Sequence, residues 1–146
     1  MSVSSDWEIS TTTAAAQLAG MLVRADMGSV NSRLSIYTTQ RPARITDNHA
    51  STAQAEIVLA KPCGVVVGGA LVLYVRDSAG ALVQFNGLPR WAEWTAGDGA
   101  VLTRCDVSDM DNGGGIRLIG GTTPEGETSP MLYAGGLVQL GVVALT

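Results

Sequence analysis

The chain has 146 residues and a net charge of −4, and only 15% of its residues are charged. That length fits one domain with a real core, and the 46% hydrophobic fraction excludes a disordered chain. A membrane-spanning helix is not predicted, because no apolar run approaches the length of about 20 residues that a span needs. The first residues also lack a basic stretch followed by an apolar one, so no secretory leader is expected.

Residues 1–30 are predicted to form an N-terminal arm, extended or partly helical, that precedes the main domain. An alanine-rich stretch continues into Leu18 and Leu22, whose spacing favours a helix. Gly20 and three consecutive threonines weaken the helical pattern, so an extended arm is the preferred alternative. Trp7 is the candidate side chain with which this arm would anchor to a neighbouring protein.

Residues 31–146 are predicted to form a single domain of short β-strands. Apolar and polar side chains alternate along several runs, and a period of two places one set on a core face. Glycine beside aspartate or asparagine separates these runs and favours tight turns. The fold class is therefore all-β, an antiparallel β-sandwich and most plausibly a jelly roll. The predicted strands are 34–37, 55–59, 71–76, 90–95, 101–107, 115–119 and 137–144.

The type of basic residue indicates a surface that meets other proteins. Lys61 is the only lysine, and the other basic residues are arginines. Arginine is enriched at interfaces and lysine is depleted there, although genomic base composition explains the bias equally well. Arg41 and Arg44 are the predicted interface residues of this kind. The acidic net charge argues against a phosphate-binding surface, so neither nucleic acid nor a membrane is expected as a partner.

Catalysis and tightly bound cofactors are not predicted. His49 is the only histidine, and no Gly-x-Ser-x-Gly elbow exists to supply a nucleophile, so it is expected to be a solvated loop side chain. Cys63 and Cys105 cannot form a four-ligand zinc site with one histidine. Two buried free thiols are the expected state of these cysteines, and a disulfide between them is the alternative.

Three aspartates are the only weak candidates for a metal site. Asp106, Asp109 and Asp111 precede Asn112 and Gly113, and closely spaced carboxylates before a glycine can bind a hard cation such as calcium. The glycines come early and no glutamate closes a calcium loop, so an acidic hairpin turn is the preferred interpretation. No metal is therefore predicted.

Two tryptophans in one predicted strand are candidates for opposite roles. Trp91 and Trp94 are three residues apart, so strand alternation directs them to opposite faces. One ring is expected in the core, and the other, assigned to Trp94, would be exposed as an interface anchor. Two packed core rings around a bulge are the alternative.

Four segments resemble small β-rich structural proteins of tailed bacteriophages and prophages. They are Arg33–Tyr37 followed by Arg41-Pro42-Ala43, Ala55–Pro62, Trp94–Leu102 and Leu132–Leu140. The likeness implies a non-enzymatic virion protein, most similar to a capsid cement or decoration protein. Such a protein would clamp the phage major capsid protein on the outside of the head, as a homodimer or other homo-oligomer. It would be assembled in the bacterial cytoplasm and reside in the virion.

Three other functions stay open on the sequence. A phage tail or head-tail connector component is the first alternative, since the resemblance does not distinguish head from tail. A glycan-binding β module is the second, because an exposed tryptophan is a sugar-stacking platform. An enzyme on a jelly-roll scaffold is the least favoured, since such metal enzymes use several histidines and this chain has one.

Overall fold

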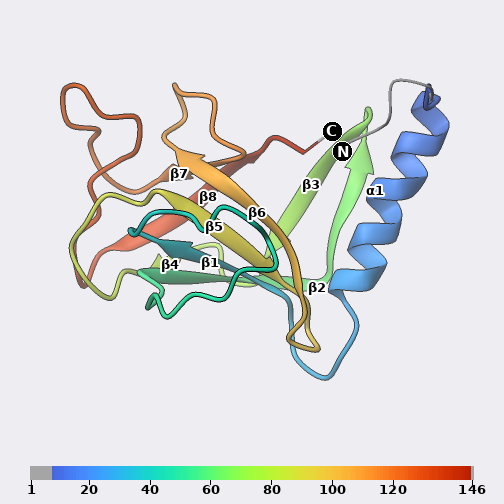
Figure 1. Cartoon of the computed structure of the whole chain (residues 1–146), viewed down its shortest axis with the longest axis horizontal. Helices are drawn as coiled ribbons and strands as arrows, with labels where there is room; N and C mark the ends of the chain where they lie inside the picture. Colours follow the sequence, from blue (N-terminus) through green and yellow to red (C-terminus); the bar gives the residue numbers. More distant parts are fainter. Residues whose placement is uncertain (1–7, 146) are drawn as a thin grey trace.

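The computed structural model describes residues 8–145 and is mostly β-structure (Figure 1). The predicted β-rich class is confirmed. The described residues form one helix and eight strands. They are α1 (Thr11–Ala25), β1 (Arg33–Tyr37), β2 (Ala55–Val67), β3 (Ala70–Val75), β4 (Ala81–Leu82), β5 (Trp91–Thr95), β6 (Val101–Ser108), β7 (Ile116–Ile119) and β8 (Leu137–Val143).

All strands belong to one sheet, in the order β3-β2-β1-β5-β6-β7-β8-β4. Neighbours pair antiparallel except β6 and β7, which are parallel. The predicted wholly antiparallel sheet and the predicted hairpin at residues 109–115 are therefore wrong at this point. The Ser108 hydroxyl donates to the Asp109 and Asn112 carbonyls and accepts from the Gly114 N–H. These bonds coil the loop, so the chain steps sideways and continues in the same direction.

The sheet curls strongly because its two edge strands are neighbours in the chain. Only residues 76–80 connect β3 to β4, and a link of that length reaches at most about 20 Å. A flat sheet would separate its first and eighth strands by about 34 Å. The Leu71 N–H donates to the Leu145 carbonyl at 3.1 Å, which ties the β3 edge to the end of the chain after β8. The finer jelly-roll topology stays a prediction.

Thr11–Ala25 form the helix α1, which the sequence offered as the alternative. The preferred prediction of an extended arm is wrong for these residues. Ser10 caps the helix, because its hydroxyl accepts the N–H three residues further on at 3.1 Å. Leu18 and Leu22 lie in the same buried cluster as the strand side chains. Burying each leucine contributes about 1.5–3 kcal/mol, which outweighs the roughly 1 kcal/mol that Gly20 costs.

β2 is longer than the predicted strand 55–59. Its first half pairs with β1, and after a register shift between Leu59 and Gly64 its second half pairs only with β3. This second half and β3 form a two-stranded ribbon that projects from the rest of the sheet, with α1 alongside (Figure 1). Pro62 and the unbroken run of valines after Gly64 conceal this part of the strand from an alternation pattern.

Candidate functional site

Residues 38–54, here called the strap, cross the outer face of β1, β5 and β6. Strand alternation turns Leu34 and Ile36 toward the core, so Tyr37 points the other way. Tyr37 lies directly opposite Trp91, and Glu93 lies directly opposite Arg104. The outer face therefore presents two aromatic rings and an ion pair, and the strap covers them.

A buried ion cluster holds the strap to the sheet. Arg104 Nε donates to Glu93 Oε2 at 2.8 Å, and the two side chains are only 7% and 9% exposed. The other guanidinium nitrogens of Arg104 donate to the carbonyls of Arg44 and Asp47, each at 2.9 Å. His49 Nε2 lies 3.3 Å from the same Glu93 oxygen. Because a buried ion pair is favourable only when its remaining groups are bonded, the two strap carbonyls complete this cluster.

Three rings fill the space beside the ions. The Tyr37 and Trp91 rings stack with centroids 4.4 Å apart, and His49 meets Tyr37 edge-on at 4.8 Å. The Arg104 guanidinium lies 5.6 Å from the Trp91 centroid. Burial, and then the charge of Glu93, raise the pKa of Tyr37 above its ordinary value. The cluster thus favours the neutral form of the tyrosine.

His49 is not the solvated loop side chain that the sequence predicts. Its side chain is 16% exposed and sits between Glu93 and the two rings. Among the described residues, its hydrogen bonds include no hydroxyl or thiol that it could activate as a nucleophile. The strap contacts supply a fixed surface, and they do not assemble a reacting pair.

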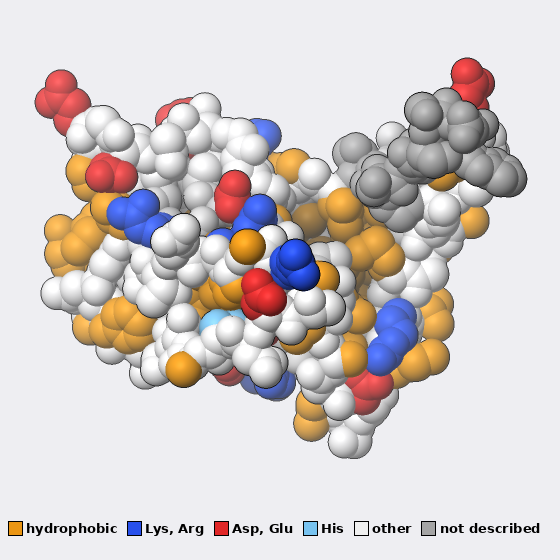
Figure 2. All heavy atoms as spheres, viewed as in Figure 1, with side chains coloured by type: hydrophobic (Ala, Val, Ile, Leu, Met, Phe, Trp, Pro, Cys, Tyr) orange, Lys and Arg blue, Asp and Glu red, His pale blue; other side chains and the backbone are white. Residues whose placement is uncertain are grey.

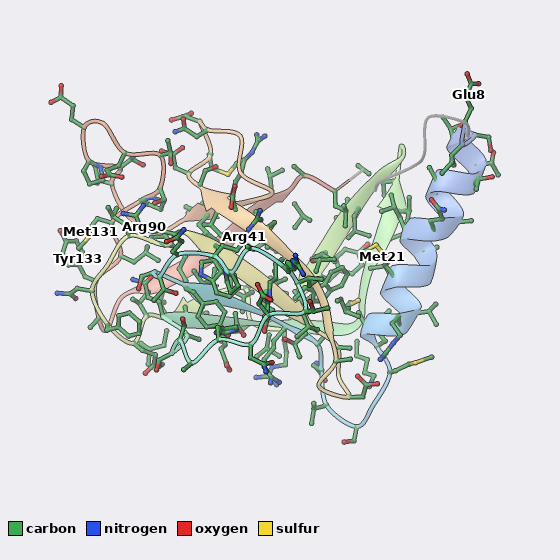
Figure 3. The ribbon with its side chains drawn as sticks, in the orientation of Figure 1. Glu8, Met21, Arg41, Arg90, Met131 and Tyr133 are labelled. Atoms are coloured by element: carbon green, nitrogen blue, oxygen red, sulfur yellow. The ribbon has the colours of Figure 1, made fainter. Side chains whose placement is uncertain are left out.

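The predicted interface arginines lie at the outer end of the strap. Arg41 is half-exposed and pairs with Asp106 at 3.4 Å, while the Arg44 carbonyl belongs to the ion cluster. Arg41 and Arg90, labelled in Figure 3, border an open polar hollow. The side chains of Arg41 and Arg44 reach the surface, and their role as interface residues stays a prediction.

The predicted exposed anchor Trp94 is buried instead, with 3% of its surface exposed. It faces the core because it pairs with Leu34, whereas Trp91 faces the strap. The prediction that the two tryptophans lie on opposite faces is therefore confirmed. The strap covers Trp91 on the outer face, so neither ring is exposed. Trp94 leaves no ring at the surface for a partner or a sugar. Trp7, the other predicted anchor, lies outside the described residues.

The three candidate metal ligands are not brought together. Asp109 accepts hydrogen bonds from the Asp111 and Asn112 N–H groups and from the Thr123 hydroxyl. The Thr123 and Asn112 side chains hold the pKa of Asp109 below its ordinary value. Asp106 points to Arg41 on the outer face of the sheet. In residues 8–145 no group of three His, Cys, Asp or Glu side chains could hold a metal ion.

Both cysteines are free thiols, as expected from the sequence; Cys63 is buried as predicted, whereas Cys105 is only half-buried. Burial raises the pKa of Cys63 and of Cys105 to about 11 in each case. The charge of Asp26 adds to the shift at Cys63. A raised pKa keeps a thiol in its neutral, weakly nucleophilic form, and both side chains pack in or against the hydrophobic core.

One face of the β2–β3 ribbon is apolar and is left uncovered by residues 8–145, and sequence reasoning missed it. Val65 and Val72 are direct partners, and Val67 and Tyr74 lie two residues further along their strands, so all four share a face. Their exposed fractions run from 37% to 58%, and this ribbon face contains no charged residue. Figure 2 shows hydrophobic side chains gathered where the ribbon leaves the rest of the sheet. Exposed apolar patches of this kind usually mark interaction sites.

No protein-family model, curated protein or solved structure matches this chain. None of the helices in residues 8–145 has the length and apolar character needed to cross a membrane. The ribbon face and the strap cluster are therefore the features on which a function has to rest.

Proposed function

We propose that this protein is a non-enzymatic structural component of a bacteriophage virion, a cement protein that clamps major capsid subunits. The observation that carries the proposal is the ribbon face of Val65, Val67, Val72 and Tyr74. An uncharged face on a projecting element is suited to burial against another protein. The resemblance of four segments to phage structural proteins supplies the class of partner.

The rest of the molecule suits a clamp that must not deform. Arg104 of the buried ion pair donates to two strap carbonyls, and His49 of the strap packs edge-on against Tyr37 and Trp91, so the strap is fixed to the outer face of the sheet. A preorganised surface loses little conformational entropy on docking. The jelly-roll architecture of cement proteins, the homodimer and the position on the capsid exterior belong to the same proposal.

The proposed mechanism is multivalent binding. A small protein that touches two shell subunits at once converts the second contact into an intramolecular one, so weak contacts add to a high avidity. The ribbon face would supply one contact. The segment containing Trp7 would supply another, as expected from the sequence.

Binding to phage heads assembled without this protein tests the proposal. The wild-type protein is expected to saturate the heads, and Val67→Asp is expected to lower the affinity by at least about tenfold, because it buries an unpaired carboxylate. Removing residues 1–7, which spares the Ser10 cap, is expected to weaken attachment as well. Quantitative gel analysis of sedimented heads measures the occupancy.

The matched control is Leu82→Asp, which places the same charge at an equally exposed leucine on β4. That variant is expected to bind as the wild type does. Heads that do not retain the wild-type protein, or that retain Val67→Asp equally well, contradict the proposal.

A further inference from the structure

The edges of β3 and β8 meet at one end and part along the rest of their length. The Leu71 N–H donates to the Leu145 carbonyl at 3.1 Å, and the described residues show no ladder between these two strands beyond that bond. Where the edges part, they border a surface hollow of about 360 Å³. Its lining consists of aliphatic residues and one glycine from β3 and β8, with no polar side chain. We call this opening the seam hollow.

The seam hollow adjoins a second, inner cavity. An inner cavity of about 110 Å³ lies under it, and Leu73 and Val143 line both spaces. Trp94 forms part of the inner wall. An apolar side chain that enters the hollow therefore meets two side chains with room to shift, as in an anchor pocket at the centre of an interface.

A cationic residue, Arg117, is the strand neighbour of one residue that lines the seam hollow. Arg117 on β7 lies directly opposite Val142, so both side chains share the outer face. The Arg117 Nε is buried and has no hydrogen-bond partner within the described residues. Next to it, the Met110 side chain lies over Gly141, and it is 41% exposed. Arginine and methionine are among the residues enriched in interface centres.

We propose that the seam hollow docks a segment of a partner protein in which an aliphatic side chain lies beside an aspartate or glutamate. The aliphatic group would fill the uncharged hollow, and the carboxylate would pair with the Arg117 guanidinium, which would turn outward to meet it. Charge complementarity favours this occupant, because the lining carries no charge and Arg117, the cross-strand neighbour of Val142, is a cation. A second copy of this chain is a poorer fit, since each copy carries a net charge of −4.

This inference deepens the proposed function, since it rests on attachment to another protein and names the chemistry of one contact. Selection from a displayed library of random peptides tests it without phage particles. Peptides that pair an aliphatic residue with an adjacent Asp or Glu are expected to be enriched on the wild-type protein. Their affinity for Arg117→Glu, measured by calorimetry, is expected to fall by at least tenfold. Replacing the peptide carboxylate by lysine is expected to restore binding to that variant.

Two matched variants separate the hollow from the rest of the surface. Arg90→Glu makes the same charge change at an exposed arginine elsewhere, and it is expected to leave peptide binding unchanged. Val142→Asp is expected to abolish binding, whereas Leu82→Asp is not. Arg117→Gln, which adds no negative charge, is expected to weaken binding and to keep the wild-type unfolding midpoint, so a folding defect is recognised.

Selected peptides that carry Lys or Arg, or that bind Arg117→Glu as tightly as the wild type, overturn the inference. Dimerisation of the wild-type protein that Val142→Asp abolishes would assign the hollow to a second copy and overturn it as well. Peptide recognition without any binding to phage heads would overturn the proposed function and leave this inference standing. If Arg117→Glu leaves binding to phage heads unchanged, this inference is overturned and the proposed function stands.

Discussion

At the scale of single residues, the strap cluster shows how charged side chains come to be buried in a small β-protein. Glu93 and Arg104 face each other across β5 and β6, and the strap then removes both from water. Desolvating an isolated charge costs several kcal/mol, so each ion depends on the other and on the strap carbonyls. The cluster therefore ties the strap and the sheet into one unit.

Arg104→Ala is expected to destabilise the fold by about 3–5 kcal/mol, because it leaves the Glu93 carboxylate buried without a cation. Arg33→Ala is the control: its ion pair with Glu56 is exposed and 3.9 Å long, and its loss is expected to cost less than about 1 kcal/mol. Urea unfolding measures both variants. Combining Arg104→Met with Glu93→Gln is expected to recover part of the loss, and equal stabilities of Arg104→Ala and Arg33→Ala would contradict this account.

At the scale of elements, the helix and the ribbon illustrate how tertiary packing overrides local preference. α1 contains a glycine and three leading threonines, yet it forms because Leu18, Leu22 and Ala25 are buried on one face. Gly64 on the ribbon lets β3 and this helix both approach, since a β-carbon there would collide with the Val72 carbonyl of β3 and press on Leu22 of the helix. The two glycines thus differ: the helix tolerates Gly20, whereas the packing of the ribbon requires Gly64.

Gly20→Ala is expected to stabilise the protein by about 0.5–1 kcal/mol, because alanine has the higher helix propensity and nothing lies within 4 Å of the added carbon. Gly64→Ala, the same substitution on the ribbon, is expected to destabilise by about 1–3 kcal/mol through overpacking. Thermal and urea unfolding give the two signs. A loss of stability in Gly20→Ala would show that the helix is strained at that position.

At the scale of the whole molecule, the curled sheet produces the two surfaces on which the proposed function and the proposed docking site rest. The short link between the edge strands forces the curl, and the curl brings β3 toward β8 without pairing their full lengths. The seam hollow is the part of that junction left open. β2 and β3 extend beyond the rest of the sheet with α1 beside them, and the ribbon face is the side of this extension that the described residues leave exposed (Figure 1).

Removing residues 144–146 is expected to destabilise the fold by about 3 kcal/mol. The loss comprises about 1 kcal/mol for each of two backbone hydrogen bonds, made by Ala144 and Leu145, and a similar amount for the packing of Leu145. Because these residues also line the cavity beside Trp94, the tryptophan emission is expected to shift to longer wavelength. Leu137→Ala, at an exposed site on β8, is the control, and an unchanged emission spectrum in the truncated protein would count against closure at this point.

The sequence by itself determined the β-rich class and the position of most strands. Alternation of side chains is a local property with a period of two, so the runs around Leu34, Leu71, Val101 and Val138 predict their strands closely. The acidic balance and the free state of the two thiols were also available from composition and spacing. Residues in one short segment were enough for each of these inferences.

Only the tertiary structure decided the features on which the proposed function rests. The curl of the sheet and the burial of Trp91 under the strap depend on contacts between segments far apart in the chain, and the parallel pair of β6 and β7 depends on the coiled loop between them. The burial of Trp94 and of His49 follows from the same contacts, so local patterns misplaced both side chains. The seam hollow is the gap left between β3 and β8, and no local pattern in either strand encodes a gap between two strands. The physical reason is that alternation specifies which face a side chain occupies, whereas long-range packing decides what covers that face.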